Sequence, residues 1–288
     1  MERYQVILAY NGSRYKGFQR QAKARSVQGV VERALSKLGW QGKSILAAGR
    51  TDTGAHAEGQ VIAFDLEWNH DLHDLQTALN TYLPSDVVAR QVSRVCQSFH
   101  PRHDASWRRY IYRLYCQPLR NPLLEPYAWR VWPQVDIEIL QPLAQSLVGP
   151  HDFGAFGTPP RVGGTTVRLV LQASWAQEQP YLVFEITAQA FLYHMVRHLV
   201  FMQVAIAQGK LPVDELQRSL DTGVEITRQA KPGVKVDKLV HGLAPAQGLV
   251  LVEVSYPPEA VSLDEDKVDN KNKMTRDKLV TRSEFGER

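Results

Sequence analysis

The 288-residue sequence contains only two cysteines and lacks a long apolar run. Cys96 and Cys116 each lie in an apolar, strand-like segment, which predicts two buried thiols in a reducing cytoplasm and leaves no thiol framework for a metal. The longest strongly apolar run, LVFMQVAIA, is far shorter than the roughly 20 residues that cross a bilayer, and the start of the chain has no signal-peptide pattern. These absences predict a compact cytoplasmic protein without a membrane segment.

Acidic residues are absent between Arg3 and Val31, although the net charge of the whole chain is only +4. This stretch carries six basic residues, interleaved with aromatic ones: Arg3, Arg14, Lys16, Arg20, Lys23 and Arg25, with Tyr4, Tyr10, Tyr15 and Phe18. A basic and aromatic surface suits a nucleic-acid backbone, but an ordinary solvated surface has a similar composition. We take Arg14, Lys16 and Arg20 as candidate contacts to RNA phosphates.

The order of the expected elements repeats along the chain. Hydrophobic periodicity predicts strand, helix, strand, strand, helix and strand over residues 3–10, 26–39, 44–49, 60–67, 71–83 and 87–95. Ser26 is the expected N-cap of the first helix. The same order returns over residues 107–116, 136–149, 165–177, 181–190, 192–209 and 248–256, with Asp136 as a cap.

This repeat predicts the fold class and the domains. The fold is α/β (α+β), with two ferredoxin-like β-α-β-β-α-β units that form one extended, mainly antiparallel sheet. Helices are expected on one face, with an active-site cleft between the units. We expect the units at residues 1–104 and 105–258, an insertion at 212–242 in the second, and a charged, disordered tail at 259–288.

One short loop between two apolar runs, AAGRTDTGAHAEGQ at residues 47–60, holds a single carboxylate, Asp52. Its three glycines, Gly49, Gly54 and Gly59, allow unusual backbone angles and the close approach of a ligand. An aspartate among Thr and Gly is most often a turn residue that bonds its own backbone. The triplet Asp-Thr-Gly is also typical of aspartic proteases, and it recurs at residues 221–223. The second copy follows a helical pattern, and Arg50 would keep Asp52 ionised, so the protease remains a remote alternative.

Six spaced segments between residues 8 and 256 carry a family resemblance. AAGRTDTGAHAEGQVIAF resembles the G-R-T-D-x-G-V-H-A signature of tRNA pseudouridine synthases of the TruA type, with Ala55 where that family usually has valine. YNGSRYKGFQRQ and SFHPRHDASWRRYIYRLY resemble two further family segments, and HDFGAFG, FLYHMVRHLV and PAQGLVLVEVSY follow in family order. Departures are Pro101, where alanine is frequent, and a missing glycine after the arginine helix.

The resemblance implies an isomerase that turns uridine into pseudouridine without a cofactor. By similarity, Asp52 is the catalytic aspartate, Arg197 is the arginine that pairs with it, and Tyr110 is the tyrosine that stacks on the target base. Arg50, inside the signature, is expected to contact the substrate. The family also implies a homodimer and the tRNA anticodon stem-loop, at tRNA positions 38–40, as the target. The sequence leaves open whether Asp52 attacks C1′, adds to the base or removes a ribose proton.

Other interpretations of the same residues remain. Arg197 could be a surface arginine, but its helix is apolar nearly all round, so the charge needs a buried partner. Tyr110 could be a core aromatic residue. His194 and His198 have a zinc-binding spacing, but neither a glutamate nor a third ligand accompanies them, so we expect no metal site. A non-catalytic RNA-binding module of ferredoxin-like fold is the main alternative function.

Overall fold

The first half of the chain contains the first predicted cycle. The computed structural model describes residues 1–161, 163–221 and 242–262. Its first elements are β1 (Glu2–Tyr10), η1 (Gly12–Arg14), α1 (Val27–Lys37), β2 (Leu46–Ala47), β3 (His56–Leu66), α2 (Leu72–Tyr82) and β4 (Val87–Val95). Ser26 caps α1 as expected, because its side chain accepts a hydrogen bond from the Gly29 N–H. The strands lie in the order β4-β1-β3, and β2 pairs with β3.

The second half repeats this arrangement. It contains β5 (Trp107–Tyr115), β6 (Trp129–Arg130), α3 (Ile137–Gln145), β7 (Gly149–Asp152), β8 (Val167–Glu178), β9 (Tyr181–Ala188), α4 (Met195–Ala207), η2 (Ala246–Gly248), β10 (Leu249–Ser255) and α6 (Pro258–Val261). Its strands lie in the order β10-β5-β9-β8, with β7 added beyond β8 and β6 paired with β5. In both halves the last strand of the cycle therefore lies beside the first.

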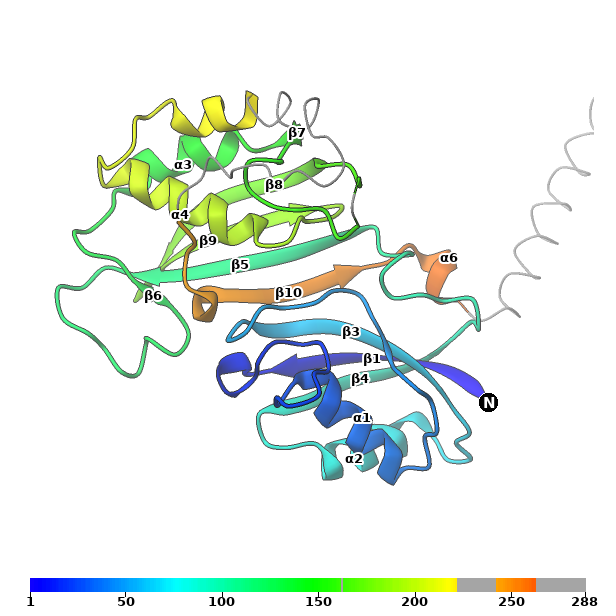
Figure 1. Cartoon of the computed structure of the whole chain (residues 1–288). Coiled ribbons are helices and arrows are strands. Elements are labelled where there is room, and N and C mark those ends of the chain that lie inside the picture. Colours follow the sequence, from blue (N-terminus) through cyan, green and yellow to red (C-terminus); the bar gives the residue numbers. More distant parts are fainter. Residues whose placement is uncertain (162, 222–241, 263–288) are drawn as a thin grey trace, which may run out of the picture.

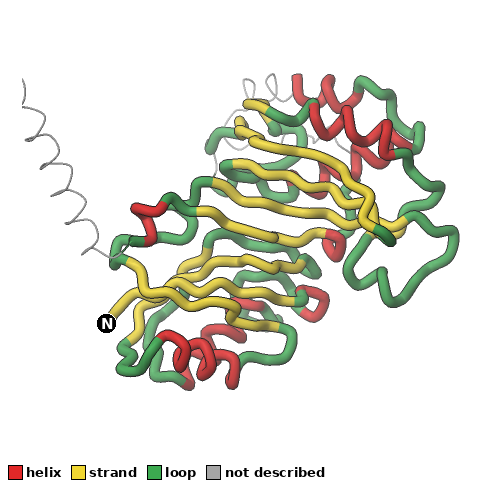
Figure 2. The backbone as a smooth tube through the Cα atoms, turned by 180° about the vertical axis from the view of Figure 1, so that it is seen from behind, coloured by secondary structure: helices red, strands yellow, loops and turns green. Residues whose placement is uncertain are grey.

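Strands β3 and β10 join the two halves into one ten-stranded sheet. They pair in parallel over two residues only, His56 with Val250 and Ala57 with Leu251, whereas most other pairs are antiparallel. Next to this short pairing, β3 and β10 lie so close that a Cβ on Gly59 would be 2.2 Å from the Val252 carbonyl oxygen. Gly59 is thus needed for close packing. The helices α1 to α4 cover one face of the sheet, and within the described part of the chain the other face carries no helix (Figures 1 and 2). These findings confirm the predicted fold class.

Two hydrophobic cores lie under the helices, one in each half. Tyr4, Phe18 and Leu35 are fully buried in the first, and Phe153, Phe184 and Leu199 in the second. Strand β10 contributes to both, because Leu249 packs into the second core while Leu251 and Val254 pack into the first. The predicted boundary at residues 104/105 lies between β4 and β5.

Several element boundaries differ from those expected. The strand expected over 44–49 is only the two-residue β2, and α3 ends at Gln145, which leaves room for the short strand β7. Helix α4 begins at Met195 and not at residue 192, because His194 has a left-handed backbone with φ of 69° and the Tyr193 N–H bonds to the Thr158 carbonyl.

Parts of the expected insertion and tail can be compared with the structure. Within the insertion predicted at 212–242, residues 215–221 are helical, and residues 222–241 lie outside the described part. The tail was expected to be disordered from residue 259, but α6 occupies its first residues, and 263–288 lie outside the described part. Neither cysteine forms a disulfide; Cys96 is buried and Cys116 half-buried. Among the described helices, none is long and apolar enough to cross a membrane.

Candidate active site

The loop that carries Asp52 connects β2 to β3 and is held by the segment that follows β1. The Phe18 N–H donates to the Thr51 carbonyl at 3.1 Å, and the Tyr10 hydroxyl lies 2.8 Å from the Thr51 hydroxyl. The Gly54 N–H donates to the Tyr15 carbonyl at 3.3 Å, and Gly54 alone of the three loop glycines has a positive φ, of 85°. The loop is therefore fixed by buried contacts on both sides of Asp52.

Arg197, in the first turn of α4, meets Asp52 from the other half of the molecule. Its Nη1 lies 2.6 Å from Asp52 Oδ2, and both side chains are nearly buried, at 12% and 13% exposure. The Arg197 Nε also donates to the Ala244 carbonyl at 2.7 Å, which fixes the plane of the guanidinium. The predicted pairing of Asp52 with Arg197 is therefore present. Arg50 was expected to hold the carboxylate ionised, but it is exposed, and within the described residues the ion pairs of Asp52 are with Arg197 and His194.

His194 is a residue of this site that the sequence analysis missed. Its Nε2 lies 3.5 Å from Asp52 Oδ2, and its left-handed backbone directs it there just before α4 begins. The sequence showed only its four-residue spacing from His198, which gave no indication of a contact with Asp52. His198 instead places its Nδ1 2.7 Å from the Gly242 carbonyl. Over the described residues, no group of three or more potential metal ligands is found.

Tyr110 lies in β5, beside β10 on one side and β9 on the other. Its ring packs edge-on against Phe191, with ring centres 4.9 Å apart, and it contacts both hydrophobic cores. A Cβ on Gly49 would lie 3.9 Å from the Tyr110 hydroxyl, so this hydroxyl points toward the Asp52 loop. Burial raises the pKa of Tyr110 to about 12, which keeps the hydroxyl neutral near pH 7. Tyr110 is thus both a partly buried core residue and a neighbour of the candidate site.

The basic stretch from Arg3 to Val31 differs from the expected surface in two ways. Its four aromatic residues are buried in the first core and are not available to RNA: Tyr4, Tyr10, Tyr15 and Phe18. Three of its basic residues are paired with acids from elsewhere, Arg3 with Asp65, Arg20 with Glu32 and Arg25 with Asp86.

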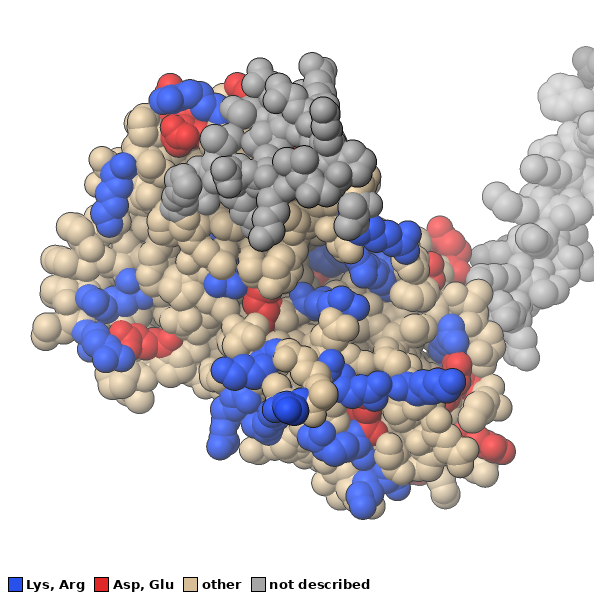
Figure 3. Space-filling view, viewed as in Figure 1, with Lys and Arg blue, Asp and Glu red and all other residues tan. Residues whose placement is uncertain are grey.

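The candidate phosphate contacts of this stretch are nevertheless on the surface. Arg14 and Lys16 are exposed, and so is Arg20 despite its ion pair. Figure 3 shows Lys and Arg side chains gathered over the part of the helix-bearing face where α1 and α2 lie.

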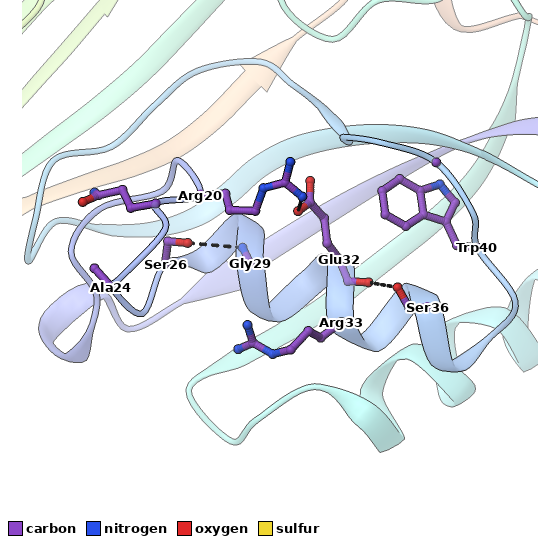
Figure 4. Close-up of a pocket in the computed structure, with 10 residues that line it drawn as sticks. Arg20, Ala24, Ser26, Gly29, Glu32, Arg33, Ser36 and Trp40 are labelled. Atoms are coloured by element: carbon purple, nitrogen blue, oxygen red, sulfur yellow. Dashed lines mark hydrogen bonds and ion pairs between the residues drawn. The ribbon is translucent and has the colours of Figure 1, made fainter.

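A hollow of about 310 Å³ lies beside α1 and does not include Asp52. Arg20, Glu32, Arg33 and Trp40 line it (Figure 4). Glu32 is bonded by Arg20 at 2.7 Å and by the Gln28 amide at 2.8 Å, so its charge is already matched within the fold. This hollow is part of the helix packing and not of the site around Asp52.

The protease alternative does not fit the surroundings of Asp52. Asp221, from the second Asp-Thr-Gly triplet, is exposed and accepts a hydrogen bond from Gln217 at 2.9 Å, one helical turn earlier. Asp52 lies against Arg197 and His194, whereas a protease dyad needs a second carboxylate that shares a proton. The aspartic protease interpretation is therefore wrong.

Comparison with known proteins identifies the family. The family model described as tRNA pseudouridine synthase matches residues 6–104 and 143–257. The chain belongs to the tRNA pseudouridine synthase family. It is 36% identical to tRNA pseudouridine synthase A of Limosilactobacillus fermentum, over 91% of this chain and 99% of the relative. It is 35% identical to the proteins of the same name from Streptococcus uberis and Legionella pneumophila strain Corby, over 89% of this chain and 99% and 94% of those relatives. The matched ranges contain Asp52, Arg197 and most of the two predicted units.

Proposed function

We propose that this protein isomerises uridine to pseudouridine in tRNA, with Asp52 as the catalytic carboxylate. The observation that carries the proposal is the nearly buried pair of Asp52 and Arg197, which holds a carboxylate in one orientation at the junction of the two halves. Membership of the family, and relatives named tRNA pseudouridine synthase A, support the reaction and the substrate.

The reaction needs few groups from the protein. The N1–C1′ bond of uridine breaks, the base turns, and a C5–C1′ bond forms; N1 gains a proton and C5 loses one, so no electrons are exchanged. Asp52 supplies a negative charge near the ribose, and Arg197 fixes its orientation. Tyr110 offers a ring for the base, and the exposed Arg50 contacts the substrate RNA. This chemistry requires no redox cofactor, and we propose a cofactor-free enzyme.

The finer points of the proposal rest on the family resemblance. The target uridines lie in the anticodon stem-loop, and the active form is a homodimer. The enzyme works in the cytoplasm, in keeping with two cysteines that form no disulfide. Sequencing of pseudouridines in tRNA from cells with and without the protein tests the position, and light scattering of the purified protein tests the dimer.

Substitution of Asp52 separates the enzyme from a non-catalytic RNA-binding module. Asp52→Asn keeps the size of the side chain but removes its charge, so it should abolish tritium release from tRNA labelled at uridine C5. Its affinity for tRNA should stay within a few-fold of wild type. Asp65→Asn, in a carboxylate that pairs with Arg3 outside this site, is the matched control and should keep full activity. Turnover by Asp52→Asn would exclude Asp52 from the mechanism, and a wild-type protein that binds tRNA without turnover would favour the binding module.

A further inference from the structure

Tyr193 is an exposed aromatic residue at the edge of the candidate site. Its side chain is 58% exposed, although it lies between Phe191, which packs against Tyr110, and His194, which contacts Asp52. Single exposed rings are common on protein surfaces, but this one adjoins the residue that contacts Asp52, so it is positioned to meet a ligand of that site.

The ring of Tyr193 is held in place before any ligand binds. One face stacks on the His194 imidazole, with ring centres 3.6 Å apart and an interplanar angle of 30°. The Tyr193 N–H donates to the Thr158 carbonyl at 3.0 Å, and the two residues form an isolated β-bridge. A ring fixed in this way loses little conformational entropy when a second flat group stacks on its open face.

The charge around Tyr193 also suits RNA. Partial burial and, to a lesser extent, the nearby Asp52 carboxylate raise its pKa above the ordinary value, so the hydroxyl is neutral at pH 7. The exposed Arg50 belongs to the Asp52 loop, and its cation can balance a phosphate close to the stacked base.

We propose that Tyr193 is a stacking platform for the nucleobase that neighbours the target uridine in the RNA strand. The proposal rests on the proposed function and extends it to a second nucleotide. Tyr110 is partly buried and its hydroxyl points toward the Asp52 loop, so it suits the target base itself, whereas the ring of Tyr193 is at the solvent edge. A strand that delivers one base toward Asp52 must place the next base outside the site, where Tyr193 lies.

The affinity of an anticodon stem-loop RNA tests the proposal. Tyr193→Ala should raise the Kd by about 5- to 100-fold, the range expected for loss of one base–aromatic stack. Tyr193→Trp, which keeps a flat ring, should bind within about threefold of wild type. Trp132→Ala removes a similarly exposed aromatic residue just after β6 and should leave the Kd unchanged. Unchanged affinity in Tyr193→Ala would overturn the proposal.

A change in the RNA identifies the contacted base without relying on a protein variant. An abasic nucleotide next to the target uridine, on the 5′ or the 3′ side, should weaken wild-type binding as much as Tyr193→Ala does. The same RNA should not weaken Tyr193→Ala further, because the stack is already lost. The assignment would be overturned if the abasic neighbour raised the Kd of the wild type and of Tyr193→Ala by the same factor. It would also be overturned if the effect of Tyr193→Ala depended only on an abasic nucleotide at the target position itself. Pseudouridine formation by the wild type is measured in parallel: its absence would refute the proposed function, whereas turnover with no effect at Tyr193 would refute this inference alone.

Discussion

Asp52 and Arg197 form a 2.6 Å ion pair although they are 145 positions apart in the sequence. Asp52 comes from the loop before β3 and Arg197 from the first turn of α4, so the pair bridges the two halves of the molecule. A pair that is assembled in this way exists only when both halves have folded and joined. The site is therefore sensitive to changes that leave either half intact but alter their contact.

Arg197→Lys should lower the rate of pseudouridine formation by about 10- to 100-fold. Arg197 bonds the Ala244 carbonyl through Nε and Asp52 through Nη1, and a single ammonium cannot keep both bonds in the same geometry. Single-turnover rates at saturating enzyme measure the effect. A lysine variant with the wild-type rate would show that the orientation of Asp52 does not depend on the guanidinium.

Removal of the charge at position 197 should affect stability as well. Arg197→Met leaves the Asp52 carboxylate nearly buried without its main partner, which should lower the free energy of unfolding by about 3–5 kcal/mol. Adding Asp52→Asn to this variant should restore much of the loss. Urea denaturation of the two variants and the wild type provides the comparison, and equal stability in all three would show that the pair is solvated.

Tyr110→Leu should lower the modification rate at least tenfold, because it removes the ring on which the target base stacks and one stack is worth about 1–3 kcal/mol. Tyr110→Phe keeps the ring and should bind tRNA nearly normally. Since the pKa of Tyr110 is raised to about 12, the phenylalanine variant should also share the wild-type pH–rate profile between about pH 6 and 9. Melting temperatures measured beside the rates decide between a substrate contact and a core residue. Unfolding of Tyr110→Leu, or an unchanged rate, would assign Tyr110 to the core alone.

Replacing Arg14 and Lys16 with alanine should weaken tRNA binding and reduce its salt dependence. Each lost phosphate contact lowers the log–log slope by up to about 0.7 to 0.9. Arg20→Ala should have a smaller effect, because Arg20 already pairs with Glu32 at 2.7 Å. Lys210→Ala, in an exposed lysine beyond α4, serves as the control. A slope that the double substitution leaves unchanged would place the RNA elsewhere on the surface.

His56 should make the stability of the protein depend on pH. Burial lowers its pKa, and its Nδ1 accepts the Gly12 N–H at 3.1 Å while Nε2 lies 3.1 Å from the Pro126 carbonyl, an arrangement that suits the neutral ring. The unfolded chain takes up a proton near pH 6.5 but the folded chain only at lower pH. This stability is fully present above about pH 6.5 and is lost as the pH falls below it.

His56→Gln tests this assignment, because a glutamine can accept from Gly12 and donate to Pro126 without titrating. Urea denaturation at pH 7.5 and pH 5.0 should show a smaller loss of stability in the variant than in the wild type. The pKa of His100 is also lowered by burial, but His100 is present in both proteins and its effect cancels. The same loss in both proteins would mean that His56 is not the group involved.

Local patterns predicted most of the fold, and the family motifs predicted the main pair of the site. Alternating strands and capped helices such as the one begun by Ser26 depend on nearby residues, so they were visible in the sequence. The partners of Arg20 and Arg25 were not, because Glu32 and Asp86 meet them through folding over 12 and 61 positions. His194 was missed because its approach to Asp52 depends on a left-handed backbone, for which a histidine gives no signal.

The position of β10 has a consequence for how the protein is made. It is the last strand among the described residues, and yet it lies in the middle of the sheet, between β3 and β5. During synthesis the first half can fold while the rest is still being translated, since domains fold from the N-terminus as they emerge. The strand pairing between β3 and the second half has to wait for residues 249–255. A nascent or truncated chain that lacks this strand would have the Asp52 loop and the Arg197 helix but not the strand pairing that joins the two halves of the sheet. The two halves of the sheet can therefore pair through β10 only when translation is nearly complete.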